Sequence, residues 1–142
     1  MAAIGNIVVN DGEATPVAHT FEPAKTTADF AFWEDRDAGI YIGNKKVTVQ
    51  LTRPQGNGNV GNRNLKLLIK LEIPRLEVTS NSTVTGIAPA PTVAYRLVGE
   101  MMFTIPERST AQERKNLRTM MHLMLSGNAQ IADAIDKLSV PY

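Results

Sequence analysis

Three stretches in the middle of the chain alternate apolar and polar side chains, and this alternation constrains the fold more than any other feature. In residues 46–52 and 65–73 the odd-numbered positions are apolar, and the even-numbered positions are polar except for Leu68. Residues 95–105 follow a similar pattern. A period of two is typical of β-strands, because successive side chains point to opposite faces. The stretches predict an antiparallel sheet, spanning residues 45–105, with one covered face and one solvated face.

The N-terminal part predicts a hairpin over residues 4–22. An apolar, β-branched run reaches Val9, the sequence Asn-Asp-Gly at 10–12 is a tight-turn signal, and Pro23 is expected to end the second strand. The next segment carries Phe30, Phe32 and Trp33 among four acidic residues. We interpret it as a surface segment whose aromatic side chains lie in the core or in an interface.

Residues 109–138 predict two helices. Ser109 or Thr110 can cap the first helix, since Gln and Glu follow three residues later, and Gly127 is a stop signal. Asn128 can cap the second helix. Each helix has an apolar stripe at helical spacing.

Strands followed by helices predict an α+β fold, and a length of 142 residues suits a single domain over 1–142. Two short helices cannot cover such a sheet alone. A dimer in which the helices of each subunit cross the sheet of its partner would bury both surfaces. The residues expected in this dimer interface are Leu117, Met120, Met121, Met124, Ile131 and Ile135.

Charge is distributed unevenly along the chain. Residues 1–42 carry a net charge of −5, residues 43–75 carry +6, and residues 76–142 are balanced, which leaves +1 overall. A basic block in a nearly neutral chain predicts one positive surface that attracts a polyanion. From charge alone, a solvated face is the simpler interpretation.

The residue types that catalysis and metal binding need are scarce. Cysteine is absent, which excludes disulfides and thiol nucleophiles. His19 and His122 have no metal-ligand spacing, and Asp133 with Asp136 fits the polar side of a helix. We find no phosphate-binding loop and no serine-nucleophile motif. No apolar run reaches the ~18–20 residues of a membrane span, and the first residues do not form a signal peptide. We therefore expect no enzyme, catalytic residue, metal, cofactor or membrane partner.

Several segments resemble the coat proteins of single-stranded RNA bacteriophages, the leviviruses. They are residues 46–51, 64–74, and 133–138 with the final Pro141 and Tyr142. The region around Glu113 and Arg118, and residues 4–7 before the first turn, are also similar, and the Q-beta branch is the most similar. The match follows nearly the whole chain in order and is weakest between residues 21 and 44.

The resemblance implies a fold and a function. It implies an N-terminal β-hairpin, a five-stranded antiparallel sheet, two C-terminal α-helices and an intertwined dimer with a continuous sheet. Such dimers assemble into a quasi-equivalent (T=3) icosahedral shell that packages single-stranded RNA against the inner sheet face. Many members also bind an RNA hairpin as a translational repressor. The protein would be made in the bacterial host cytoplasm and located in the virion.

The resemblance also assigns residues to RNA binding. The positions that match the family's RNA-facing residues are Lys46, Thr48, Gln50, Lys66, Lys70, Val98 and Glu100. We also expect Arg53 and Arg63, at the ends of the connection between the first two strands, and Arg96, on the polar face of the third, to belong to this RNA-binding set. Two positions depart from the family pattern, because Val98 replaces a stacking tyrosine and Leu68 replaces a polar residue. The 76–92 loop corresponds to the one that meets its neighbours at the symmetry axes. Q-beta-like relatives bridge these loops with disulfides, so a shell of this cysteine-free chain must rely on noncovalent contacts.

Two alternatives stay open at this point. The first is a non-viral dimeric nucleic-acid-binding protein that uses the same basic sheet but forms no shell. The second is a small α+β enzyme whose activity would depend on a carboxylate or on His122.

Overall fold

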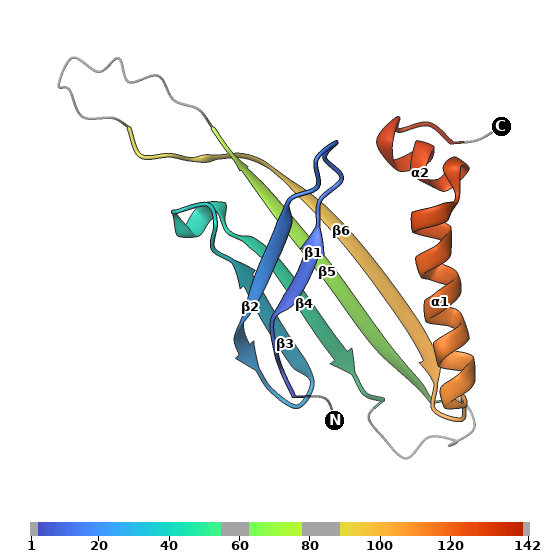
Figure 1. Ribbon diagram of the computed structural model, residues 1–142. Helices are drawn as coiled ribbons and strands as arrows, with labels where there is room; N and C mark the ends of the chain where they lie inside the picture. The colour runs from blue at the N-terminus through green and yellow to red at the C-terminus, as the bar shows by residue number, and fades with distance from the viewer. Residues whose placement is uncertain (1–2, 55–62, 78–88, 141–142) are drawn as a thin grey trace. The chain divides into compact units, whose positions relative to one another are not determined.

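The structure is a computed structural model, and it describes residues 3–54, 63–77 and 89–140. Six strands form one sheet in which their order along the sheet follows their order along the chain (Figure 1). They are β1 (Ile7–Asn10), β2 (Ala18–Thr26), β3 (Phe30–Asp35), β4 (Lys45–Thr52), β5 (Asn64–Leu76) and β6 (Val93–Pro106). Two C-terminal helices follow, α1 (Ala111–Gly127) and α2 (Ala129–Asp136). The α+β class is confirmed. The described strands number six with the hairpin included, rather than a hairpin plus five.

The hairpin differs in detail from the expectation. Seven residues separate β1 from β2, so the Asn-Asp-Gly signal does not form a two-residue turn. Asp11 closes the loop instead, since its Oδ1 accepts a hydrogen bond from the Val17 N–H at 2.9 Å and its N–H donates to the Val17 carbonyl at 3.0 Å. The backbone N–H of Val17 also holds the pKa of the Asp11 carboxyl below its usual range.

Pro23 does not end β2, which is a correction to the sequence-based expectation. The strand continues to Thr26, and its register with β3 shifts between Pro23 and Lys25. A β-bulge is one of the few places where a strand tolerates proline, because the missing N–H is then not needed by the ladder.

The segment with the three aromatic residues forms a full strand rather than a surface segment. β3 pairs with both β2 and β4, and its last two residues, Glu34 and Asp35, are buried. A 3-10 turn, η1 (Tyr41–Gly43), then leads into β4. Burial of charged residues at the end of a strand is the reverse of the usual pattern. Arg36 Nε lies 3.7 Å from Glu34 Oε2, and the partners of Asp35 are described below.

Local capping signals set the ends of both helices as expected. The side chain of Thr110 accepts from the Glu113 N–H at 3.2 Å, and the Glu113 carboxylate accepts from the Thr110 N–H at 2.7 Å, which completes a capping box. Asn128 caps α2 through the N–H groups of Gln130 and Ile131.

The chain divides into two compact units. One comprises residues 1–55 and 65–104, and the other comprises residues 56–64 and 105–142. That they act as a single domain stays a prediction. In the described part of the chain, Phe21 is the only hydrophobic residue that is fully buried. No helix among the described residues has the length and apolar character needed to cross a membrane.

Candidate nucleic-acid interface

The register of β4 and β5 places the even-numbered side chains together on one face of the sheet. Lys46 lies opposite Glu72, Thr48 opposite Lys70, and Thr52 opposite Lys66. Side chains of directly paired residues lie on the same face of the sheet, and so do side chains of residues that are two positions apart in one strand. We call this surface, formed by the even-numbered residues of β4, β5 and β6, the even face. The odd face carries the apolar residues of β4 and β5.

Contacts with β6 extend the even face. Lys70 Nζ lies 3.6 Å from Glu72 Oε1 and 3.7 Å from Glu100 Oε1, which links β5 to β6. Arg96 of β6 lines a hollow together with Lys46 and Glu72. Lys46, Lys66 and Arg96 form no ion pair with another described residue, so their charges are available to an external anion.

The two arginines at the ends of the connection between β4 and β5 differ from Lys46 and Lys66, because each forms an ion pair. Arg53 Nε lies 2.8 Å from Asp29 Oδ1, and Arg63 Nε lies 3.3 Å from Glu107 Oε2. Each charge is balanced by a carboxylate, so neither adds to the net positive charge of the even face. Most of this connection, residues 55–62, lies outside the described residues, as does 78–88 of the 76–92 loop.

The neutral positions expected to read RNA also lie on the even face. Gln50 is exposed opposite Leu68, and Thr48 is half-buried opposite Lys70. Val98 is 49% exposed. The face thus offers a hydroxyl and an amide for hydrogen bonds, but no aromatic ring at position 98.

The residues expected at the dimer interface lie on helices that have no buried residue. Met120 is 62% exposed and Ile135 is 60% exposed. Leu117, Met124 and Ile131 are also exposed, whereas Met121 is half-buried.

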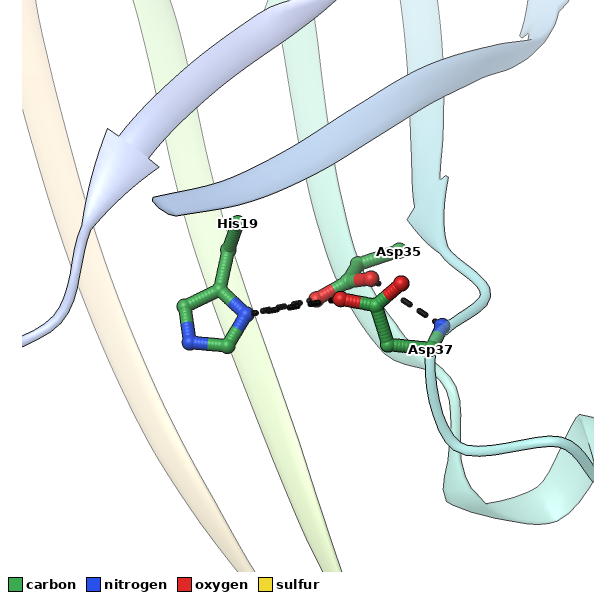
Figure 2. Close-up of side chains that lie close together, drawn as sticks. All are labelled: His19, Asp35 and Asp37. Atoms are coloured by element: carbon green, nitrogen blue, oxygen red, sulfur yellow. Dashed lines mark hydrogen bonds and ion pairs between the residues drawn. The ribbon is translucent and has the colours of Figure 1, made fainter. Parts of the chain in front are cut away.

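One polar cluster was not anticipated from the sequence. His19 of β2 points toward Asp35 at the end of β3 and toward Asp37 beyond it (Figure 2). His19 Nδ1 lies 3.1 Å from Asp35 Oδ2, and its Nε2 lies 3.3 Å from Asp11 Oδ2 in the hairpin loop. Lys45 Nζ completes the group, 2.9 Å from Asp35 Oδ2 and 3.1 Å from His19 Nδ1. We call these five residues the hairpin cluster.

The hairpin cluster explains how a carboxylate can be buried at the end of β3. Burial alone raises the pKa of Asp35, but the hydrogen bonds from Lys45 and from the Asp37 N–H outweigh burial, and the pKa lies below its ordinary value of 3.8. Ligand atoms of His19, Asp35 and Asp37 lie within 4.8 Å of one another, a spacing that can hold a metal ion. Because the Lys45 ammonium already supplies a cation there, we assign no metal to the cluster.

Comparison with known proteins identifies the family. The family model for the levivirus coat protein matches residues 2–142, which is nearly the whole chain. The chain belongs to the levivirus coat protein family. It is similar to the capsid protein of Pseudomonas phage PRR1, with 33% identity over 120 residues that cover 84% of this chain and 83% of that protein.

Solved structures of bacteriophage virus-like particles and of a bacteriophage capsid protein have the same fold. The virus-like particle of bacteriophage ESE058 matches with a TM-score of 0.87 and 33% identity, covering 99% of this chain and 100% of that one. The virus-like particle of bacteriophage NT-214 matches with a TM-score of 0.80 and 28% identity over 99% and 100% of the two chains. The capsid protein of bacteriophage GA, at 22% identity, covers 97% of each chain with a TM-score of 0.72 and supports the fold alone.

The match over the whole chain decides between the alternatives. A levivirus coat protein is a structural component of the virion, so the non-viral nucleic-acid-binding protein is not favoured. The family is one of capsid proteins rather than enzymes. Membership of the Q-beta branch stays a prediction.

Proposed function

We propose that this coat protein forms dimers, that the dimers assemble into an icosahedral shell, and that the even face binds single-stranded RNA inside it. The observation that carries the RNA-binding part is the placement of Lys46, Lys66, Lys70 and Arg96 on one face of the sheet. Among the described residues, the carboxylates on that face of β4–β6 are Glu72 and Glu100, and Glu34 of β3 lies opposite Lys46.

The edge of the sheet supports dimer formation. β6 has 14 residues and is the last of the described strands in the sheet, so one of its sides has no neighbouring strand among the residues that the structure describes. A long unpaired edge is a template for pairing with another chain, and a second copy of β6 would satisfy its backbone groups. The exposed apolar stripes of α1 and α2 need a similar cover, which the partner's sheet would provide.

The relatives support assembly into particles. The solved structures of the ESE058 and NT-214 proteins are described as virus-like particles. Since this chain is similar to both over 99% of its length, we propose the same kind of assembly for it. We propose the T=3 arrangement for the shell. The support for this arrangement is the family resemblance alone.

The chemistry of the even face favours packaging over sequence-specific recognition. Lysine and arginine contacts to phosphates give affinity that is independent of sequence and weakens with salt. Specific readout of RNA needs unstacked bases held by aromatic rings and hydrogen bonds. Thr48 and Gln50 supply the hydrogen bonds, but Val98 and Leu68 supply neither a ring nor a polar group. We therefore propose that any hairpin operator is bound more weakly than in relatives with a tyrosine at position 98.

A pair of double variants tests the RNA-binding part. Lys66→Ala with Lys70→Ala removes two cations from the even face, whereas Lys115→Ala with Lys137→Ala removes two from the helices as a matched control. The first variant should package less RNA. The slope of log affinity against log salt should fall by about 0.7 for each phosphate contact that is lost.

The second measurement is whether the purified protein assembles into particles. Electron microscopy of the purified protein should show closed shells for the natural sequence and for the control variant. Equal RNA content and equal salt dependence in both double variants would refute the assignment of RNA to the even face. Small oligomers without nucleic acid, in low salt, would refute assembly around RNA.

A further inference from the structure

Tyr41 is an exposed aromatic residue beside the even face that the family resemblance does not assign to RNA. The residue is 65% exposed, and Lys46 Nζ lies 4.4 Å from the centroid of its ring. The same ammonium donates to the Tyr41 hydroxyl oxygen at 3.4 Å. Because Lys46 belongs to the even face, these contacts place the ring next to the cations proposed to hold phosphates.

The turn that carries Tyr41 is held firmly in place. Gly43 is buried, and a Cβ at that position would lie 2.9 Å from Ala38 Cβ and 3.0 Å from Leu76 Cδ1. The Asn44 N–H donates to the Tyr41 carbonyl at 3.2 Å, and Asn44 is only 6% exposed. The backbone of the turn is therefore restrained while the side chain of Tyr41 is exposed, so stacking on the ring costs little backbone entropy.

A small hollow of about 50 Å³ lies beside the turn. Ile42 and Asn44 line it on the side of the turn, and Lys46, Glu72 and Arg96 line it on the side of the even face, together with Pro74. Lys46 lines this hollow and also contacts the Tyr41 ring, so it connects the ring to the amide of Asn44, the carboxylate of Glu72 and the cation of Arg96. This combination of ring, cations and hydrogen-bonding groups suits a nucleotide.

We propose that Tyr41 is a stacking platform for one unpaired base of the packaged RNA, with Lys46 and Arg96 binding the adjacent phosphates. The inference rests on the proposed function and adds a residue and a contact type to it. Stacking tolerates any base, because every base has a π-face. The platform therefore favours single-stranded over double-stranded segments without selecting a sequence.

Titration of the purified protein with a short fluorescent oligouridine tests the proposal. Tyr41→Leu should weaken binding by about fivefold to about 150-fold, the range found for loss of one stacked base. Tyr41→Phe keeps the ring and should bind as the natural sequence does. Ile40→Ala changes an exposed neighbour of the same turn and is the matched control.

The outcomes separate this inference from the proposed function. If Tyr41→Leu binds normally while Lys66→Ala with Lys70→Ala binds weakly, the platform is wrong and the even face stands. If both bind normally, the proposed function fails too. An equal loss in Tyr41→Leu and Tyr41→Phe would assign the effect to the hydroxyl and overturn stacking.

A second measurement covers the case in which Tyr41→Leu does not fold. Ultraviolet irradiation of the natural protein with the same oligouridine, followed by mass spectrometry of the peptides, should give a uridine adduct on Tyr41. Adducts confined to other peptides would overturn the proposal.

Discussion

Removal of the Lys45 charge should destabilise the coat protein far more than removal of the neighbouring Lys46 charge. The Asp35 side chain is only 1% exposed, and Lys45 Nζ, 2.9 Å away, is its closest cation. Lys45→Met keeps most of the aliphatic length of the side chain. It leaves the Asp35 carboxylate buried, with His19 and the Asp37 N–H as its remaining partners. Loss of one member of a buried ion pair costs about 3–5 kcal/mol, and because Lys45 is 26% exposed we expect about 3 kcal/mol.

The assay is equilibrium unfolding in urea, followed at matched protein concentration because dimer formation makes stability depend on it. Lys46→Met is the matched control, since Lys46 follows Lys45 directly, points to the other face and has no ion pair with another described residue. Asp35→Asn combined with Lys45→Met should recover part of the loss, because it removes the unpaired charge.

The pH dependence of stability is an independent test of the effect of Lys45 on Asp35. In the natural protein the pKa of Asp35 is lowered, so its stabilising contribution is complete above the unfolded value of 3.8 and is lost as the pH falls through the lower folded value. In Lys45→Met, burial acts without the opposing ammonium and the pKa of Asp35 rises. The stability gap between Lys45→Met and the natural sequence should then narrow on acidification. Equal unfolding midpoints for Lys45→Met and Lys46→Met at neutral pH would refute the reasoning.

Three further changes have defined outcomes. Phe21→Ala should lower the free energy of unfolding in urea by about 3–5 kcal/mol, because Phe21 is only 2% exposed. Val8→Ala, at an exposed position, should lower it little, and a small loss for Phe21→Ala would contradict the assigned core. Thr110→Ala should lower the stability of the helical unit by about 1 kcal/mol through loss of the capping box, and Thr119→Ala within the same helix is the control in thermal unfolding followed by circular dichroism. Val98→Tyr should strengthen the binding of an RNA hairpin in a filter-binding titration, and no gain would mean that position 98 does not face a loop base.

The parts of the fold that depend on local sequence were predictable. Alternation in β4 and β5 predicted which side chains share the even face, because the period of a strand is fixed by backbone geometry. The helix caps at Thr110 and Asn128 were also predictable, because each cap contacts N–H groups only two or three residues away in the sequence.

The parts that depend on distant partners were not predictable. β3 ends in two acidic residues, a composition that suggests a solvated segment, and contacts with Lys45, His19 and the Asp37 N–H make the burial of Asp35 possible. The ion pairs of Arg53 with Asp29 and of Arg63 with Glu107 likewise join residues far apart in the chain. Position in sequence carries no signal for such contacts, so the charge of the expected RNA-binding set was overestimated.

The order of the strands has a consequence for how the protein is made. Each strand lies beside the strand that precedes it in the chain, from β1 through β6. Contacts between neighbours in sequence form quickly, because little chain entropy is lost in closing each connection. A growing polypeptide can thus add each strand to the sheet as it leaves the ribosome. Rapid, stepwise maturation of this kind suits a product that is needed in many identical copies within one infected cell.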